Sequence, residues 1–254
     1  MGEARLPCYH RLVRTMFLAA VLLAAGCDAP GASSTGPKKT EPVAEPQPTA
    51  QAPETPKAKS PLERWAFDTD TAGSSPAGFE LLETASAGTP AQWGVLEDPT
   101  APSGGKGFGV LSTRNTGQTY NVALAPGFAA QDVELTVSLK PRSGTQDQGG
   151  GVVFRAQGAR DYYVARWNPL EKNVRFYVVV AEQRSAFKAA DLELDPTQWH
   201  TMRVLVEGPR MELFMDEDSV LVANDETLKG PGRIGLWTKA DAATWFDDLT
   251  AQNL

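Results

Sequence analysis

The sequence predicts an all-β domain of two packed antiparallel sheets, preceded by an export signal and a Pro-rich tether. Gly and Pro number 23 and 19 in 254 residues, which favours many turns over long helices. After residue 61, short runs of alternating apolar and polar residues are separated by Gly, Pro, Asn or Asp, as in antiparallel sandwiches. No segment keeps a period of 3.6 residues, so a helical bundle is excluded.

The expected strands follow one another along residues 62–254. The run 133–139 places Val and Leu on one face and Glu, Thr and Ser on the other, and it is expected to end before Pro141. Further strands are expected at 151–156, 162–167, 174–181, 199–207, 211–215, 220–222, 232–238 and 244–250. So many short strands favour two stacked sheets about 10 Å apart, with a concave surface able to accept a flat, hydroxylated molecule.

Residues 1–26 have the pattern of a secretory signal peptide. Three arginines precede an apolar run at 16–23, which is too short to span a bilayer and is followed by small residues. The string 23–27, LAAGC, resembles a bacterial lipobox, although Ala24 stands where leucine is commonest. We therefore expect lipidation of Cys27. The chain would be exported and anchored to a bacterial membrane, with its domain in the periplasm or at the cell surface. Ordinary cleavage that leaves a soluble protein is the alternative.

Residues 27–61 comprise the lipidated cysteine and a linker. Eight prolines fall within 28–61, and Val43 is the one branched apolar residue there. Such a segment buries too little apolar surface to offset its ordering entropy, so a disordered, extended tether is expected. The domain itself is expected at 62–254.

Charge and cysteine content exclude several classes of function. The net charge is −7, and residues 62–254 hold 26 acidic against 17 basic residues, which argues against a nucleic-acid partner. Two cysteines and two histidines in the whole chain are too few for a Cys/His zinc site or a disulfide-stapled scaffold.

Several strings resemble, in order, a family of secreted bacterial proteins with a concanavalin A-like jelly-roll fold related to laminin G-like modules. They are DQGGGVVFR at 147–155, DYYVAR at 161–166, NPLEKNVR at 168–175, QWHT at 198–201 and GLWTKAD at 235–241. The family is similar to the 3-keto-disaccharide hydrolase group, which is loosely called glycoside hydrolase family 16-like. The resemblance covers 62–254 and implies the jelly-roll fold and an oligosaccharide or polysaccharide ligand. The family label also implies glycosidic-bond hydrolysis, but a fold alone does not carry a function.

A candidate ligand site follows from strand parity. If three neighbouring strands are in ordinary register, their arginines share one sheet face with aromatic and amide side chains, which suits sugar recognition. The candidate residues are Arg155, Tyr162, Arg166, Trp167, Asn168, Glu171, Asn173, Arg175 and Tyr177. The alternative is a solvated convex face on which the arginines pair with acidic residues.

Catalytic carboxylates are harder to find. A retaining glycosidase needs two carboxyl groups about 5–5.5 Å apart, and the nearest match to Glu-x-Asp-x-x-Glu is 193–198, which ends in glutamine and contains Pro196. That segment is expected to be a turn. Glu171 remains the catalytic candidate if the domain is a hydrolase. His200, beside Trp199 at a strand start, is expected to be structural.

Calcium is the one cofactor to consider, through the loop carboxylates Asp147 and Asp161. Turn formation by these aspartates is the alternative, and no other cofactor is expected. Three functions stay open: a glycan-binding module, a glycosidic-bond hydrolase, and a structural or protein-binding laminin G-like envelope module. The sequence names no protein partner.

Overall fold

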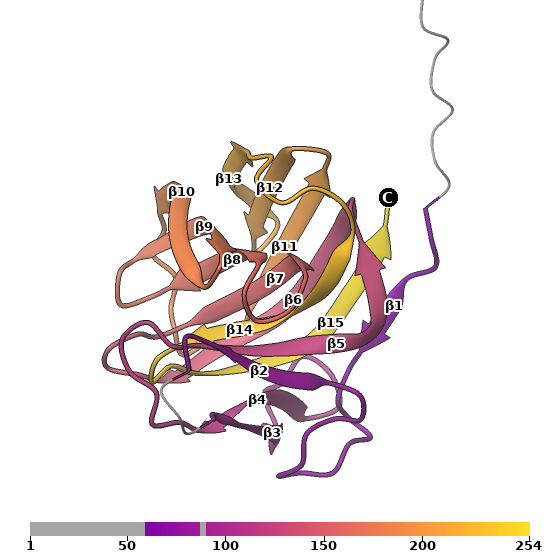
Figure 1. Ribbon diagram of the computed structural model, residues 1–254. Helices are drawn as coiled ribbons and strands as arrows, with labels where there is room; N and C mark the ends of the chain where they lie inside the picture. Colours follow the sequence, from indigo (N-terminus) through magenta and orange to yellow (C-terminus); the bar gives the residue numbers. More distant parts are fainter. Residues whose placement is uncertain (1–58, 87–89) are drawn as a thin grey trace, which may run out of the picture. The chain divides into compact units, whose positions relative to one another are not determined.

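The computed structural model describes residues 59–86 and 90–254 (Figure 1). These residues form two antiparallel β-sheets, so the predicted all-β sandwich is confirmed. The expected signal peptide, Cys27 and the linker up to residue 58 lie outside the described residues. Within the described part of the chain, no helix is long and apolar enough to cross a membrane.

Sheet A contains eight of the strands found in the described residues: β1 Glu63–Trp65, β3 Gln92–Glu97, β4 Lys106–Ser112, β6 Val133–Ser143, β11 His200–Glu207, β12 Arg210–Met215, β13 Asp218–Asn224 and β15 Ala243–Asn253. Seven of them follow the order β13–β12–β11–β6–β15–β4–β3, and β1 pairs with β15.

Sheet B contains seven strands of the described chain: β2 Glu80–Thr84, β5 Tyr120–Ala130, β7 Gly150–Ala156, β8 Tyr162–Asn168, β9 Asn173–Val180, β10 Gln183–Asp191 and β14 Gly232–Lys239. Their order is β10–β9–β8–β7–β14–β5–β2. The chain passes from one sheet to the other between β5, β6 and β7, and again between β14 and β15, which is the connectivity of a jelly roll.

The two-residue period places the core between the sheets. In β6, Val133, Leu135 and Val137 are fully buried and alternate with partly exposed polar residues. From sheet B, Phe154 and Tyr163 stack with ring centroids 5.4 Å apart. Burial of one such side chain stabilises the fold by about 1.5–3 kcal/mol.

Strand β6 continues through Pro141 to Ser143, so the expected end before Pro141 is wrong. Pro141 lies opposite Thr244 of β15, beside a register shift between Ala243 and Thr244. Proline has no N–H to donate to a ladder, and irregularities of this kind are where sheets tolerate it.

The sequence pattern does not single out the first five strands or β10. The residues of β10 are exposed or half-buried throughout, and four of the five residues of β2 are as well. Both strands are edges of sheet B. An edge strand buries few side chains, so its sequence lacks the apolar alternation that marks a central strand.

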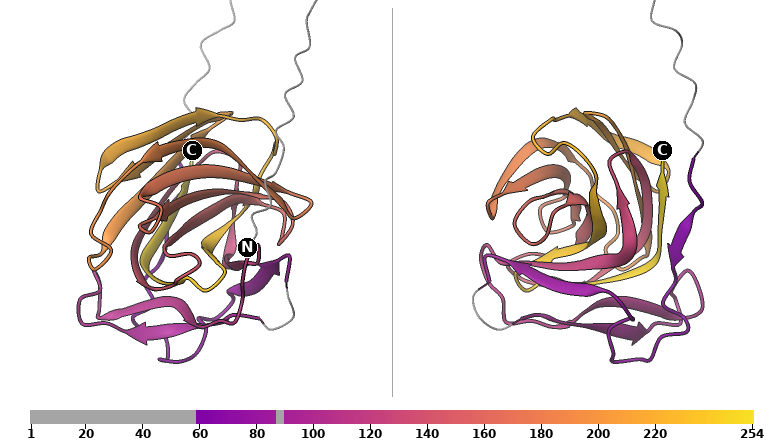
Figure 2. Two further views of the ribbon diagram at one scale, coloured as in Figure 1. Left: turned by 90° about the vertical axis from the view of Figure 1, so that its left-hand side faces the viewer. Right: turned by 45° about the vertical axis from the view of Figure 1, so that its right-hand side comes forward.

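Sheet B is strongly curved, and its free face, turned away from sheet A, lies on the inside of the curve (Figure 2). The guanidinium carbon of Arg184 on β10 lies 4.8 Å from the ring centroid of Tyr120 on β5. Five strand spacings separate these strands, so in a flat sheet they would lie about 24 Å apart. The hydroxyl oxygens of Thr84 on β2 and Tyr162 on β8 are 2.6 Å apart on the same side. We call this surface the concave face.

Candidate functional site

The middle of the concave face is filled by its own side chains. Tyr162 and Trp237 are fully buried, and Tyr120 and Tyr177 are 2% and 3% exposed. The guanidinium of Arg184 lies over the rings of Tyr120 and Tyr177, at 4.8 and 4.2 Å from their centroids. The expected concave surface that accepts a flat molecule is therefore closed in its middle, because the curvature brings the side chains of both edges together.

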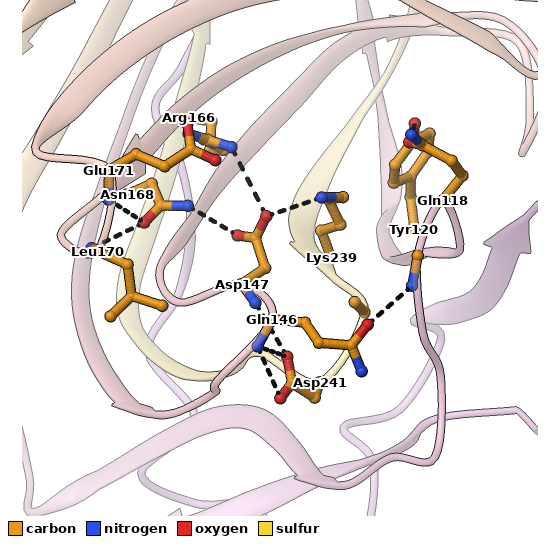
Figure 3. A network of polar contacts seen from close by, with 12 residues as sticks. Gln118, Tyr120, Gln146, Asp147, Arg166, Asn168, Leu170, Glu171, Lys239 and Asp241 are labelled. Carbon is orange, nitrogen blue, oxygen red and sulfur yellow. Dashed lines mark hydrogen bonds and ion pairs between the residues drawn. The ribbon is translucent and has the colours of Figure 1, made fainter. Parts of the chain in front are cut away.

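Polar side chains gather at one end of the concave face, where β8, β9 and β14 meet their loops (Figure 3). We call this group the Arg166 cluster, and it comprises Asp147, Arg166, Asn168, Glu171, Asn173, Arg175 and Lys239. Five of the nine predicted ligand residues belong to it, and the ring of a sixth, Tyr177, lies 5.6 Å from the guanidinium of Arg166. Strand parity brings them together, because Arg166 pairs with Arg175 and Asn168 with Asn173 across β8 and β9.

Asp147 lies at the centre of the Arg166 cluster and is 1% exposed. One carboxylate oxygen is 3.1 Å from Nζ of Lys239 and 3.7 Å from Nη1 of Arg166. The other accepts a hydrogen bond of 3.0 Å from the amide of Asn168. Burial raises the pKa of Asp147, although the charges of Arg166 and Lys239 oppose the shift.

Glu171 and Arg175 form the exposed rim, with side chains 40% and 36% exposed. Oε2 of Glu171 accepts a hydrogen bond of 2.9 Å from Arg166 and lies 3.3 Å from Nη2 of Arg175. Asn173 accepts a further bond of 3.0 Å from Arg166. Partial burial opposes ionisation of Glu171, but its polar neighbours, led by Arg166, lower its pKa below the usual value.

The turn between β8 and β9 presents Glu171 to both arginines. Oδ1 of Asn168 accepts the backbone N–H groups of Leu170 and Glu171, at 2.9 and 3.1 Å. This is the local bond by which an Asn side chain closes a turn, and Pro169 fits the turn that follows Asn168. The string NPLEKN therefore sets the position of the rim carboxylate.

Asp241 holds the loop that carries Asp147. Its carboxylate accepts the backbone N–H groups of Thr145, Gln146 and Asp147, at 2.7 to 3.0 Å. Partial burial opposes ionisation, yet these bonds lower the pKa of Asp241 to about 2. Asp241 therefore orders the loop.

Sequence reasoning missed three residues that face the same surface: Lys239, Tyr120 and Arg184. Lys239 could have been predicted from the sequence, because it follows Trp237 by two residues in the same strand and so lies on the same face. The other two could not, because Arg184 lies on an edge strand and Tyr120 begins an unrecognised one. Arg184 and Tyr120 lie close together only because the sheet is curved.

Arg155 does not share the face of Arg166 and Arg175, so this part of the parity prediction is wrong. Arg155 has a φ of 48° and lies at a register shift between β7 and β14. The extra residue of this bulge turns the side chain out of the alternation. The guanidinium is buried instead against backbone carbonyls of three other segments, those of Gln131, Gly208 and Leu228.

Trp167 and Tyr162 also differ from expectation. Trp167 is fully buried in the core between the sheets, where its ring lies edge-on to His200 with centroids 5.1 Å apart. It therefore presents no stacking surface on the concave face. Tyr162 is on the concave face, but it lies in the packed middle and its hydroxyl bonds Thr84.

The two calcium candidates lie in different surroundings. Asp161 accepts the backbone N–H of Ala181 at 2.8 Å, which ties the turn after β9. Asp147 faces the cations Arg166 and Lys239, which disfavour a bound metal ion. Among residues 59–86 and 90–254, no group of three or more His, Cys, Asp or Glu side chains has the geometry to hold a metal.

The segment before β11 is structural, as expected. Residues 196–198 form a turn, and the side chain of Asp195 accepts the N–H of Thr197 at 2.9 Å. His200 is 9% exposed, and its ring nitrogens contact Asp216 at 2.6 Å and the carbonyl of Asp195 at 2.8 Å. Both ring nitrogens are thus engaged in holding loops.

No protein-family model matches the sequence, and no curated protein matches it. Solved structures do. CBM66, a carbohydrate-binding module from Bacillus subtilis, superposes with a TM-score of 0.51 at 19% identity, over 63% of this chain and 94% of that one. The cellulose induced protein Cip1 gives 0.54 at 10% identity, over 74% of this chain and 96% of that one.

The fold is a concanavalin A-like jelly roll. A protein of unknown function from Shewanella oneidensis MR-1 has it too, with a TM-score of 0.50 at 14% identity, over 75% of this chain and 85% of that one. At these identities the likeness shows the fold alone. The jelly roll that the sequence predicts is confirmed, and the function rests on the site.

Proposed function

We propose that this protein is an exported lipoprotein whose jelly-roll domain binds a glycan at the Arg166 cluster. The cluster carries the proposal, because its donors and acceptors are fixed by buried partners while Glu171 and Arg175 are exposed at its rim. Fixed planar groups can read a hydroxyl pattern.

The fold supports the same proposal. CBM66 is by name a carbohydrate-binding module, and it shares this sandwich. A shared fold raises the expectation of a glycan ligand without deciding it. Glycan binding by variants of the Arg166 cluster tests the proposal directly.

The test is a glycan array probed with the full chain purified in detergent, followed by calorimetry on the best binder. Arg175→Ala removes a rim donor and is expected to weaken binding about tenfold. Arg160→Ala, on an exposed side chain that pairs loosely with Glu182 at 3.9 Å, is the matched control and is expected to leave binding unchanged. Absence of any glycan ligand would reject the proposal and leave the structural or protein-binding laminin G-like module.

The lipid anchor is tested separately. Cys27 is expected to carry the lipid, and the Pro-rich segment after it would hold the domain away from the membrane surface. Cells that express the full chain and Cys27→Ser are grown with a clickable fatty acid and fractionated. The unaltered chain is expected in the membrane fraction with label, and the variant without label. Equal labelling of both would exclude lipidation at Cys27.

Hydrolysis of a glycosidic bond is the second candidate. Asp147 and Glu171 both pair with Arg166, yet burial raises the pKa of Asp147 while the neighbours of Glu171 lower its pKa. Asp147 is buried and paired with two cations, so Glu171, which is exposed at the rim, is the carboxylate that could act on a substrate.

Turnover of the best binder distinguishes the two functions. Under the hydrolase alternative, Glu171→Gln is expected to abolish turnover while the substrate still binds. A disaccharide with an oxidised sugar ring is the first substrate to try, because the resembling group is named for one. Binding without turnover in the unaltered chain would exclude the hydrolase and keep the binding module.

A further inference from the structure

The Arg166 cluster and its neighbour Arg184 place more positive than negative charge on the concave face. Four cationic groups lie there, from Arg166, Arg175, Arg184 and Lys239, and two carboxylates oppose them, from Asp147 and Glu171. If Asp241 on the adjacent loop is included, the four cationic groups still outnumber the carboxylates. Residues 62–254 as a whole carry nine more acidic than basic residues, so the surplus is local to this face.

Donors without partners lie on the same surface. In the described part of the chain, Nε of Arg166, Nε of Arg175 and Nη1 of Arg184 are buried without a hydrogen bond, as is the hydroxyl of Tyr177. Arg166 is 1% exposed. The guanidinium carbons of Arg166 and Arg184 lie 5.6 and 4.2 Å from the ring centroid of Tyr177. A buried polar group without a partner costs free energy, so these donor atoms favour an added acceptor.

Glu171 shows where such an acceptor can bind. Its carboxylate contacts both Arg166 and Arg175, from an exposed turn outside the sheet. A carboxylate on a ligand that enters at this rim can take the same position and displace the Glu171 side chain into solvent. Guanidinium groups bind carboxylates through paired hydrogen bonds, which a neutral sugar hydroxyl does not match.

We infer that the ligand of the Arg166 cluster is an acidic glycan, whose uronate carboxylate binds between Arg166 and Arg175 in place of Glu171. The inference rests on the proposed glycan-binding function and names its substrate class. Asp147, which is itself paired with Lys239, holds Arg166 in position.

The test compares acids with their esters. Trimers of galacturonate, mannuronate and glucuronate, and the methyl ester of each, are titrated against the full chain by calorimetry. Esterification removes the charge and keeps the hydroxyl pattern. At least one acid is expected to bind about tenfold or more tightly than its ester.

Two variants give opposite expected shifts. Arg175→Gln removes a guanidinium and is expected to weaken binding of the acid about tenfold while leaving the ester nearly unchanged. Glu171→Gln removes the competing carboxylate and is expected to strengthen binding of the acid several-fold. Arg160→Gln is the control and should change neither. Thermal melts and near-UV dichroism check that each variant is folded.

The outcomes separate the inference from the function on which it rests. If the esters or neutral trimers bind as well as the acids, the acidic-glycan inference is wrong and glycan binding stands. If Glu171→Gln weakens binding of the acid, the ligand uses Glu171 as a partner and the displacement is wrong. If neither these trimers nor the arrayed neutral glycans bind, the proposed function fails as well.

Discussion

Arg166 and Arg175 lie directly opposite each other on β8 and β9, and both contact the same carboxylate oxygen of Glu171, at 2.9 and 3.3 Å. Two guanidinium groups side by side repel each other unless an anion lies between them. In the free protein Glu171 is that anion, and it comes from an exposed turn. The position is therefore both a structural contact and a place where another carboxylate can bind.

Glu171→Gln is expected to lower the free energy of unfolding by about 1 kcal/mol, because the two arginines lose a charged partner that is itself half in water. Urea denaturation at pH 7 measures the change. Glu182→Gln, at a carboxylate 3.9 Å from Arg160, is the control and should change stability by less than about 0.5 kcal/mol. A loss of several kcal/mol would mean that Glu171 is not free to exchange with a ligand.

Asp147→Asn is expected to cost about 3 kcal/mol or more. The substitution removes the buried counter-charge of Arg166, which is 1% exposed. It also removes the carboxylate that pairs with Lys239. Asp191→Asn, on an exposed residue of β10, is the comparison and should be nearly neutral. Equal midpoints for the two variants in urea would contradict a structural role for the buried ion pairs.

Tyr177→Phe is expected to keep or raise stability by up to about 1 kcal/mol. The hydroxyl of Tyr177 is buried without a hydrogen bond, so its removal relieves a desolvation cost in the free protein. Thermal unfolding measures the change, and a clear loss of stability would show that the hydroxyl has a partner in the free protein.

The contribution of Asp247 to stability is expected to fall as pH rises from about 4 to 6. This residue is fully buried, and its side chain and that of Asp248 both contact the Ser103 hydroxyl. Burial raises the pKa of Asp247 to about 6, with Asp248 adding to the shift. An unfolded aspartate has a pKa near 3.9, so the folded state binds more protons between these values. The loss from this group alone is about 3 kcal/mol.

Asp247→Asn removes this titration and should flatten the curve of unfolding free energy between pH 4.5 and 7. The comparison uses the slope, since Asn also changes the hydrogen bonds from Ser103 and Asp248. Groups with lowered pKa values, such as Asp241, contribute a slope of opposite sign at lower pH. An unchanged slope in the variant would mean that Asp247 is ionised throughout.

Arg155→Lys is expected to cost about 2–4 kcal/mol and to leave glycan affinity unchanged. The guanidinium donates to carbonyls of three segments, and an ammonium cannot reach all three from one position. Denaturation and glycan titration are measured on the same preparation. Loss of glycan binding in a variant of normal stability would show that Arg155 takes part in binding the ligand.

The sequence by itself determined the all-β class, most of the central strands and the face shared by Arg166, Arg175 and Tyr177. These follow from the two-residue alternation of side chains along a strand. That alternation can be read from one segment without knowing which strands it pairs with. The Asn168 turn that presents Glu171 was also readable, since an Asn side chain bonds its own following backbone.

Only the tertiary structure decided which residues meet. The bulge at Arg155 depends on the pairing of β7 with β14, so a count of residues along one strand misses it. The closing of the concave face by Arg184 depends on the curvature of the whole sheet, which brings β10 over Tyr120. Curvature and register are properties of several strands together, and no single segment of the chain encodes them.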